Sequence, residues 1–329
     1  MDRKSSWSRV NRSEPCPVCG GTTWCTVSGD GSAARCMRVE SDRPSSARDG
    51  TVAYLHVLAD RPAMTPAPKK PAAAPVAKID NVPELALSFR DAAGAGQKRA
   101  ELARELSVSV RSLEAAWVGL GRNPDNGREF GSFPSRDGCG RIVGITRRFH
   151  DGRKLTYPGT SNGGVFACER WWELPGPVFI VEGPSDVCAM HSAGLSAVGR
   201  PSNVAGAEVI SQLLGRRIGR DRLVIVVCED DRKSEAEVAA KTAIPHDPAC
   251  EGCQRCWPGE YGAKTVMASL VAAGWPAEYV RPLDGWKDAR AMWVGGVLPE
   301  WLELIGAVGC KYRGEIWEVC CGKAAESRS

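Results

Sequence analysis

The pattern of apolar and polar residues changes in character several times along this 329-residue chain. Residues 60–83 are rich in Pro, Ala and Lys and have no apolar period, which indicates a semi-extended linker. Residues 97–121 place apolar side chains at helical spacing with a break near Ser107, which predicts two helices, the second ending at Gly121. Residues 131–166 alternate short β-like runs with turns, which predicts a small antiparallel sheet.

From Pro177 onward, fully apolar runs alternate with helical stretches. The runs at 178–181 and 223–228 are each followed by a helical pattern, which predicts βαβ units and a mainly parallel sheet. We therefore expect an α/β fold, in which this sheet is preceded by a small α+β subdomain and by a cysteine-bearing module.

These changes of pattern divide the chain into five segments. They are an N-terminal module at 1–59, the linker at 60–83, a helical and β subdomain at 84–174, the α/β domain at 175–295 with an insertion at 232–260, and a C-terminal segment at 296–329.

The composition is that of an ordinary globular protein, with 43% hydrophobic and 25% charged residues. The formal net charge of +4 is compatible with a nucleic-acid partner without requiring one. No apolar run reaches the ~18 residues of a membrane span and the N-terminus lacks the apolar segment of a signal peptide, so we predict a cytoplasmic protein with no membrane partner. In that setting, cysteines at Cys-x-x-Cys spacing indicate a metal rather than disulfides.

Cysteines gather first in the N-terminal module. Cys16 and Cys19 have the spacing that lets two thiolates reach one tetrahedral ion. The hairpin sequence Gly29-Asp-Gly-Ser places the next two cysteines on or near paired strands. We predict a zinc ribbon with four ligands, Cys16, Cys19, Cys25 and Cys36, in which His56 is the alternative to Cys25. Buried reduced thiols are the other interpretation.

A second group of cysteines lies in the insertion. Cys250, Cys253 and Cys256 form two overlapping Cys-x-x-Cys spacings, and His246 offers a fourth ligand. We predict a second zinc site, with free thiols or an iron–sulfur fragment as the alternatives.

Acidic residues follow two of the predicted strands. Glu182 ends the first strand, and Asp186 lies in the helix after it. Glu229 and Asp231 follow the second strand, with Asp230 between them pointing the other way if the strand period continues. Such a group of carboxylates can hold Mg²⁺ and still leave room for phosphate oxygens.

A glutamate that ends one strand, together with an acid-x-acid triplet that ends a later one, resembles the Toprim domain of primases, topoisomerases and some nucleases. The resemblance implies that Glu182 acts as general base or metal ligand and that Glu229 and Asp231 are metal ligands, these three being the catalytic residues. Glu229 is itself a departure, since the triplet of this domain usually begins with aspartate.

The same domain has a Lys-Asp element after its last core strand, and Lys287-Asp288 resembles it. Asp288 is therefore expected to support the Mg²⁺ ions. Asp186, in the helix after Glu182, is expected to support them as well. Arg290 stands where many relatives carry another acid, which implies an altered metal site.

The resemblance extends to bacterial-type (DnaG-like) DNA primases. Residues 106–121 are similar to the helical element before the primase core, residues 133–144 to the hairpin after it, and residues 154–159 to a basic stretch near the catalytic cleft. Zinc ribbon, linker, subdomain and Toprim domain also follow in the primase order. The contacts to nucleic acid or nucleotide that this implies are Arg136, Arg141, Arg147, Arg148 and Lys154.

The resemblance implies a nucleotidyltransferase that makes short RNA primers on a single-stranded DNA template from ribonucleoside triphosphates, with Mg²⁺ or Mn²⁺ at the acidic site and Zn²⁺ in the ribbon. The chain has no G-x-x-x-x-G-K-[ST] phosphate loop, so we expect a truncated phage-like or mobile-element form that works with a separate replicative helicase. A metal-dependent nuclease and a non-catalytic DNA-binding protein are the alternatives.

Overall fold

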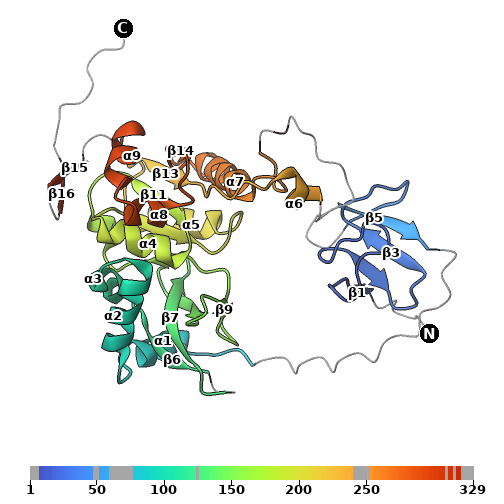
Figure 1. The fold of residues 1–329 in the computed structure, drawn as a ribbon, viewed down its shortest axis with the longest axis horizontal. Coiled ribbons are helices and arrows are strands. Elements are labelled where there is room, and N and C mark those ends of the chain that lie inside the picture. The colour runs from blue at the N-terminus through green and yellow to red at the C-terminus, as the bar shows by residue number, and fades with distance from the viewer. Residues whose placement is uncertain are drawn as a thin grey trace, which may run out of the picture. The chain divides into compact units, whose positions relative to one another are not determined.

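The computed structural model of the protein describes residues 7–46, 52–58, 77–123, 126–239, 250, 252–307, 310–313 and 316–319. The chain divides into two compact units (Figure 1). The N-terminal unit takes in residues 1–75 and 233–251, and the core unit takes in residues 76–232 and 252–329. The division into five segments stays a prediction.

The N-terminal unit contains an antiparallel sheet in the order β1-β2-β3-β5-β4. Its strands are β1 (Trp7–Arg9), β2 (Thr26–Ser28), β3 (Ala33–Cys36), β4 (Pro44–Ser46) and β5 (Val52–Val57), and the same unit holds the short helix α6 (Glu235–Ala239). The predicted hairpin joins β2 to β3, where the Asp30 carboxylate accepts hydrogen bonds from Ser28 and Ser32. The buried apolar cluster of this sheet consists of Val10 and four cysteines.

The core unit begins with a helical and β subdomain. Three helices, α1 (Val82–Arg90), α2 (Ala95–Leu106) and α3 (Val110–Ala115), precede four antiparallel strands, β6 (Gly119–Arg122), β7 (Glu129–Arg136), β8 (Ile142–Arg148) and β9 (Lys154–Thr156). The strands pair in the order β6-β7-β8-β9, which confirms the predicted antiparallel sheet.

The predicted end of the second helix is wrong, because α3 stops at Ala115, a turn follows, and Gly119 to Arg122 form strand β6. Trp117 adopts a left-handed backbone conformation with φ 59°, which turns the chain out of the helix. Gly119 then passes so close to α1 that a Cβ atom there would clash with the carbonyl oxygen of Phe89. Tertiary packing against α1 therefore overrides the local helical pattern.

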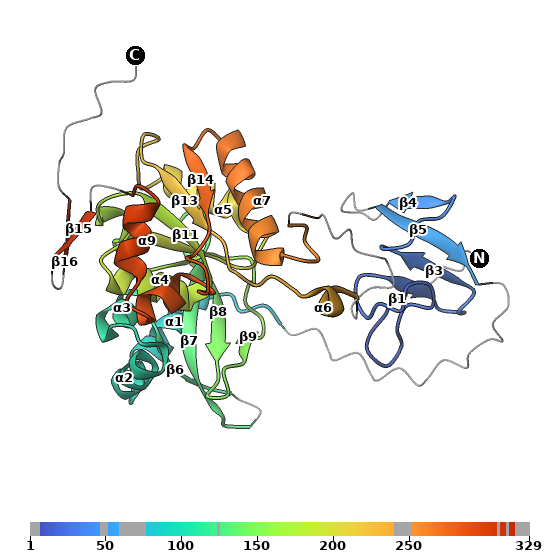
Figure 2. The ribbon, with the colours of Figure 1, turned by 45° about the horizontal axis from the view of Figure 1, so that its top comes forward.

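A mainly parallel sheet forms the centre of the core unit, in the order β10-β12-β11-β13-β14, and confirms the predicted α/β fold (Figure 2). Only β10 runs antiparallel to its neighbour. In chain order the elements are β10 (Phe166–Ala167), η1 (Trp171–Glu173), β11 (Val178–Glu182), α4 (Gly183–Ser192), β12 (Ala197–Arg200), α5 (Ala207–Gly215), β13 (Val224–Val227), α7 (Pro258–Ala272), β14 (Ala277–Val280), α8 (Ala289–Val294) and α9 (Leu298–Leu304).

Both faces of this sheet are buried. Phe179 and Val181 of β11 pack in an apolar cluster with α4, α8 and α9, whereas Val178 and Ile180 pack in another with α5 and α7. Burial on both faces explains why the strands are continuous apolar runs and why the first polar side chain appears only where a strand ends.

The last described elements are two short paired strands, β15 (Cys310–Arg313) and β16 (Ile316–Val319). Among the helices of the described residues, none has the length and apolar character needed to cross a membrane.

Candidate active site and cysteine clusters

Glu182 lies at the carboxyl end of β11, where Gly183 adopts φ 80° and the chain turns into α4. Its carboxylate faces Arg200 at the end of β12, with 3.7 Å between Oε2 of Glu182 and Nη2 of Arg200. The side-chain amide of Asn203, with its nitrogen turned toward Glu182, donates to both carboxylate oxygens at 2.6 and 2.8 Å. These two side chains hold the Glu182 carboxylate in one orientation.

Arg200 is the most deeply buried cation of this site, since its side chain is 0% exposed. It donates to the backbone oxygens of Asn203 at 2.7 Å and Val227 at 3.2 Å. Burial, together with the neighbouring Glu229 carboxylate, raises the pKa of Glu182 to about 7, and the charge of Arg200 opposes that rise. A carboxylate with such a pKa can take up a proton near neutral pH.

Three further acids, Asp186, Glu229 and Asp288, gather at the same edge of the sheet, each with a carboxylate oxygen within 4.8 Å of the others. They come from the first turn of α4, from the residue after Cys228 at the end of β13, and from the N-cap of α8. Asp288 accepts a hydrogen bond from the backbone of Ala291 at 2.7 Å, which fixes it at the start of its helix.

The electrostatics of these three acids favour a bound cation. Asp186 and Asp288 are buried, and burial together with the charge of Asp288 raises the pKa of Asp186 well above its usual range. Burial likewise raises the pKa of Glu229. Oxygen ligands of an octahedral Mg²⁺ at about 2.1 Å lie about 3 to 4 Å apart, so the spacing of these carboxylates fits that ion.

Asp231, predicted to be catalytic, has a different set of contacts. Its Oδ1 accepts a hydrogen bond of 2.8 Å from the backbone N–H of Gly259, in the first turn of α7. Asp230 is exposed, and its backbone N–H donates to the carbonyl of Lys287. The structure thus brings Asp186 and Asp288 close to Glu229. The Asp231 side chain accepts a hydrogen bond from the N-terminus of α7.

A cavity of about 690 Å³ lies over these acids. Its walls include Glu182 and the three gathered carboxylates, together with five cationic side chains, which are Arg148, Lys154, Arg200, Lys287 and Arg290. The ammonium group of Lys287 lies 3.5 Å from the carboxylate of Glu229. The backbone N–H of Arg290 donates to Asp186 at 3.1 Å, so this residue is placed directly beside the acids.

Two of the five predicted nucleic-acid contacts line this cavity, namely Arg148 and Lys154. The guanidinium of Arg148 also pairs with Glu105 at 2.6 Å. Lys287, Arg200 and Arg290 were not predicted as cations of the site. For Arg200 a signal existed, because it ends an apolar run just as Glu182 does.

The other three predicted contacts have structural partners. Arg147 is buried, with its guanidinium 5.6 to 5.9 Å from the ring centres of Phe130, Phe149 and Tyr157. Arg136 donates to the carbonyl of Gly140 at 3.2 Å. Arg141 pairs with Asp137 at 2.8 Å within the β7–β8 turn.

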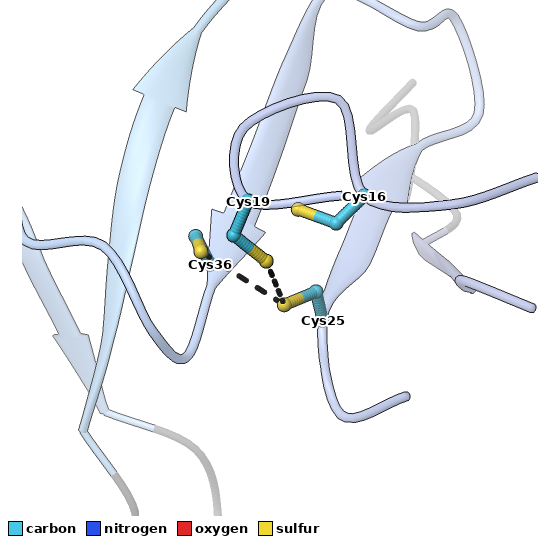
Figure 3. A group of neighbouring side chains, drawn as sticks. All are labelled: Cys16, Cys19, Cys25 and Cys36. Atoms are coloured by element: carbon cyan, nitrogen blue, oxygen red, sulfur yellow. Dashed lines mark hydrogen bonds between the residues drawn. The ribbon is translucent and has the colours of Figure 1, made fainter. Parts of the chain in front are cut away.

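The four cysteines of the N-terminal unit point toward a common centre, as Figure 3 shows, and their sulfur atoms all lie within 4.8 Å of one another. The measured separations are 3.8 Å for Cys19 and Cys25 and 3.9 Å for Cys25 and Cys36. A tetrahedral zinc with bonds of about 2.3 Å holds its sulfurs about 3.8 Å apart. His56, the alternative ligand, instead bonds the carbonyl of Val39 at 3.0 Å.

Hydrogen-bond donors surround these sulfurs. Cys36 accepts from the backbone N–H groups of Arg38 at 3.4 Å and Val39 at 3.2 Å. The Arg38 guanidinium lies 3.7 Å from the sulfur of Cys19. Burial alone would raise the pKa of Cys19, but the donors Gly21 and Arg38 outweigh it and lower this pKa to about 7. Cys19 is therefore prepared to carry a thiolate, the form that binds zinc. Burial raises the pKa values of Cys25 and Cys36, so a bound cation would be needed to stabilise their thiolates.

In the second cysteine group, Cys250, Cys253 and Cys256 offer sulfur atoms within 4.8 Å of one another. The sulfur atoms of Cys253 and Cys256 are 3.7 Å apart. The predicted fourth ligand, His246, lies outside the described residues.

Part of the chain is similar to a known DNA primase. No family model matches the chain. A DNA primase of Deinococcus radiodurans is 30% identical over 155 residues, which are 42% of this chain and 27% of that protein. The chain thus aligns with about a quarter of the length of this curated relative.

The solved structures that match part of the chain include primases. The Escherichia coli primase catalytic core is 17% identical with a TM-score of 0.45, covering 64% of this chain and 74% of its own. The Aquifex aeolicus primase, with zinc-binding and RNA polymerase domains, is 13% identical with a TM-score of 0.49, covering 69% of this chain and 59% of its own. The chain is similar to bacterial-type DNA primases, as its acidic strand ends and its order of elements indicated.

Proposed function

We propose that this protein is a primase, which joins ribonucleoside triphosphates into short RNA primers on a single-stranded DNA template. The observation that carries the proposal is the cavity in which Asp186, Glu229 and Asp288 lie together with cationic side chains. Nucleotidyl transfer needs both, because carboxylates hold the metal ions and cations neutralise the triphosphate. Identity of 30% to a DNA primase over 155 residues supports this choice among phosphoryl-transfer reactions.

Each group of the site has a proposed role in this reaction. Mg²⁺ or Mn²⁺ held by the three gathered acids would supply charge neutralisation at the reacting phosphate. Arg148, Lys154 and Arg290 bind the triphosphate of the incoming nucleotide. Glu182, oriented by Asn203 and Arg200, accepts the proton of the attacking 3′-hydroxyl as its oxygen bonds to the α-phosphorus and pyrophosphate leaves.

We further propose that the four-cysteine cluster binds Zn²⁺ and that the ribbon around it contacts the DNA template. Trp24 is 67% exposed beside Cys25 and offers an aromatic face on which a base can stack. A separate replicative helicase is the proposed protein partner. Since the proposed template is single-stranded DNA, we also propose a cytoplasmic location.

The test is a primer-synthesis assay with single-stranded templates of varied sequence, labelled ribonucleotides, and Mg²⁺ or Mn²⁺. Wild type should make labelled oligomers, whereas Asp186→Asn and Glu229→Gln should lose at least about 100-fold in rate, the scale of a lost charge-stabilising group. Asp230→Asn is the matched control, because Asp230 is the exposed acid next to Glu229. The absence of oligomers from wild type on all templates would reject the proposal, and degradation of the template would favour a nuclease.

A further inference from the structure

Three cysteines within seven consecutive residues, Cys250, Cys253 and Cys256, have no role in the function proposed above. Their sulfur atoms lie within 4.8 Å of one another. Cys253 and Cys256 are 3.7 Å apart, close to the about 3.8 Å expected of two thiolates on one tetrahedral zinc. One tetrahedral metal ion can bind all three thiolates at once.

The last of these cysteines leads directly into the acidic site. Trp257 follows Cys256, and its indole N–H donates to the backbone oxygen of Glu229 at 3.1 Å. Two residues later, the backbone N–H of Gly259 donates to the carboxylate of Asp231 at 2.8 Å. The segment 256–259 therefore holds the chain on both sides of Asp230 through two hydrogen bonds.

Side chains from α7 and from the end of β14 also hold Trp257 in place. The Trp257 ring lies under the guanidinium of Arg281, 4.7 Å from its centre. Arg281 forms two hydrogen bonds, of 2.9 and 3.0 Å, with the fully buried carboxylate of Glu260, which also pairs with Lys264 at 2.7 Å. On the other side of Trp257, the chain is held in the described residues by the cysteine turn at 253–256, where Cys256 is buried.

We propose that Cys250, Cys253 and Cys256 bind a second zinc ion, and that this ion fixes Trp257 and so positions Glu229. The three thiolates supply three of the four positions of a tetrahedral site. The ion is structural and takes no part in proton or phosphoryl transfer. Its binding is independent of the proposed function, whereas its effect on Glu229 bears on the metal site that the proposed function requires.

Zinc content of the purified full chain, measured by mass spectrometry, tests the site directly. Wild type should hold two zinc ions per chain. The double variant Cys253→Ser/Cys256→Ser should hold one, and Cys139→Ser, which changes an exposed cysteine outside both clusters, should still hold two. A single zinc in wild type that the double variant retains would overturn the proposal, and so would iron in place of zinc.

Positioning of Glu229 is tested by Mn²⁺ binding to the acidic cluster, followed by electron paramagnetic resonance without nucleotides or DNA. The double variant should bind Mn²⁺ about 10-fold more weakly, the scale of a lost outer-shell partner. Trp257→Phe should keep both zinc ions but also weaken Mn²⁺ binding, because it removes the indole N–H that bonds Glu229 and leaves every cysteine in place. Unchanged Mn²⁺ affinity in both variants would overturn the positioning role. If wild type holds two zinc ions but makes no primers, the zinc site stands and the proposed function fails.

Discussion

In the N-terminal unit, four cysteines and Val10 make up the buried apolar cluster of the sheet. In the core unit, three acids lie at the edge of a sheet whose two faces are covered by separate apolar clusters. Both groups are spaced to hold a metal ion. In the first, however, the ligands are themselves the core, whereas in the second the core is built from other residues.

This difference decides what a metal does for each region. The cysteine cluster replaces a hydrophobic core that such a small sheet cannot assemble, so zinc binding and folding are expected to be one event. The acidic cluster works against folding, because burial raises the pKa values of Asp186 and Glu229 and disfavours their charged forms. Because its apolar clusters are built from other residues, we expect the core unit to fold without its metal.

The largest effect expected from this comparison is the unfolding of the ribbon on zinc removal. A strong chelator, or Cys25→Ser, should abolish amide-exchange protection in β2 and β3, because structural zinc contributes about 10 to 16 kcal/mol in small modules. The β11 and β13 amides of the core unit should stay protected. Hydrogen exchange with mass spectrometry measures both regions in one sample, and Cys139→Ser is the control. Protected β2 and β3 amides in the metal-free protein would show that this sheet folds without zinc, contrary to our expectation.

The next effect separates activity from stability in the core unit. Asp186→Asn should reduce primer synthesis by about 1,000-fold, since it removes a metal ligand. The same change should raise the stability of the metal-free protein by about 1 kcal/mol, because the raised folded-state pKa of Asp186 means that its ionised form opposes folding at neutral pH. Calorimetry in a chelating buffer checks the second part. A lower melting temperature for Asp186→Asn would show that the carboxylate stabilises the fold.

Much of the parallel sheet could be predicted because each of its strands has a recognisable pattern within its own few residues. A strand buried on both faces must be a continuous apolar run, so 178–181 and 223–228 identified β11 and β13 without knowledge of their neighbours. Strand β6 could not be found in this way. Its residues 119–122 carry two glycines in four positions, and one of them is required only by the approach of α1.

The sequence identified several residues of the site but not how they are arranged in space. Glu182 and Glu229 were identifiable because each is the first acid after an apolar run. That Asp288 and Asp186 come within 4.8 Å of Glu229 depends on where α8 and α4 begin in space, which no spacing along the chain reveals. Arg147 was predicted to contact nucleic acid, but aromatic rings from three different segments of the chain surround it.

A buried acid with cationic partners should behave in the opposite way to Asp186. Burial alone would raise the pKa of Glu260, but Arg281 and Lys264 outweigh it and hold this pKa below the usual range. Glu260→Gln should therefore lower the stability of the core unit by about 3 kcal/mol at pH 7, as when a buried ion pair is broken. Because the folded-state pKa is lowered, the wild-type advantage should persist at neutral pH and fade as the pH falls below about 4. Urea unfolding at pH 7 and pH 3.5 measures it.

The smallest effect tests the assignment of Asp231 to α7 rather than to the metal ions. Asparagine keeps an oxygen that can accept the Gly259 hydrogen bond, so Asp231→Asn should lose less than about 10-fold in primer synthesis, while Asp231→Ala, which removes that acceptor, should lose more. Mn²⁺ affinity should change little in Asp231→Asn. If Asp231→Asn instead falls as far as Asp186→Asn in both measurements, Asp231 is a metal ligand. The acidic cluster would then extend to the N-terminus of α7.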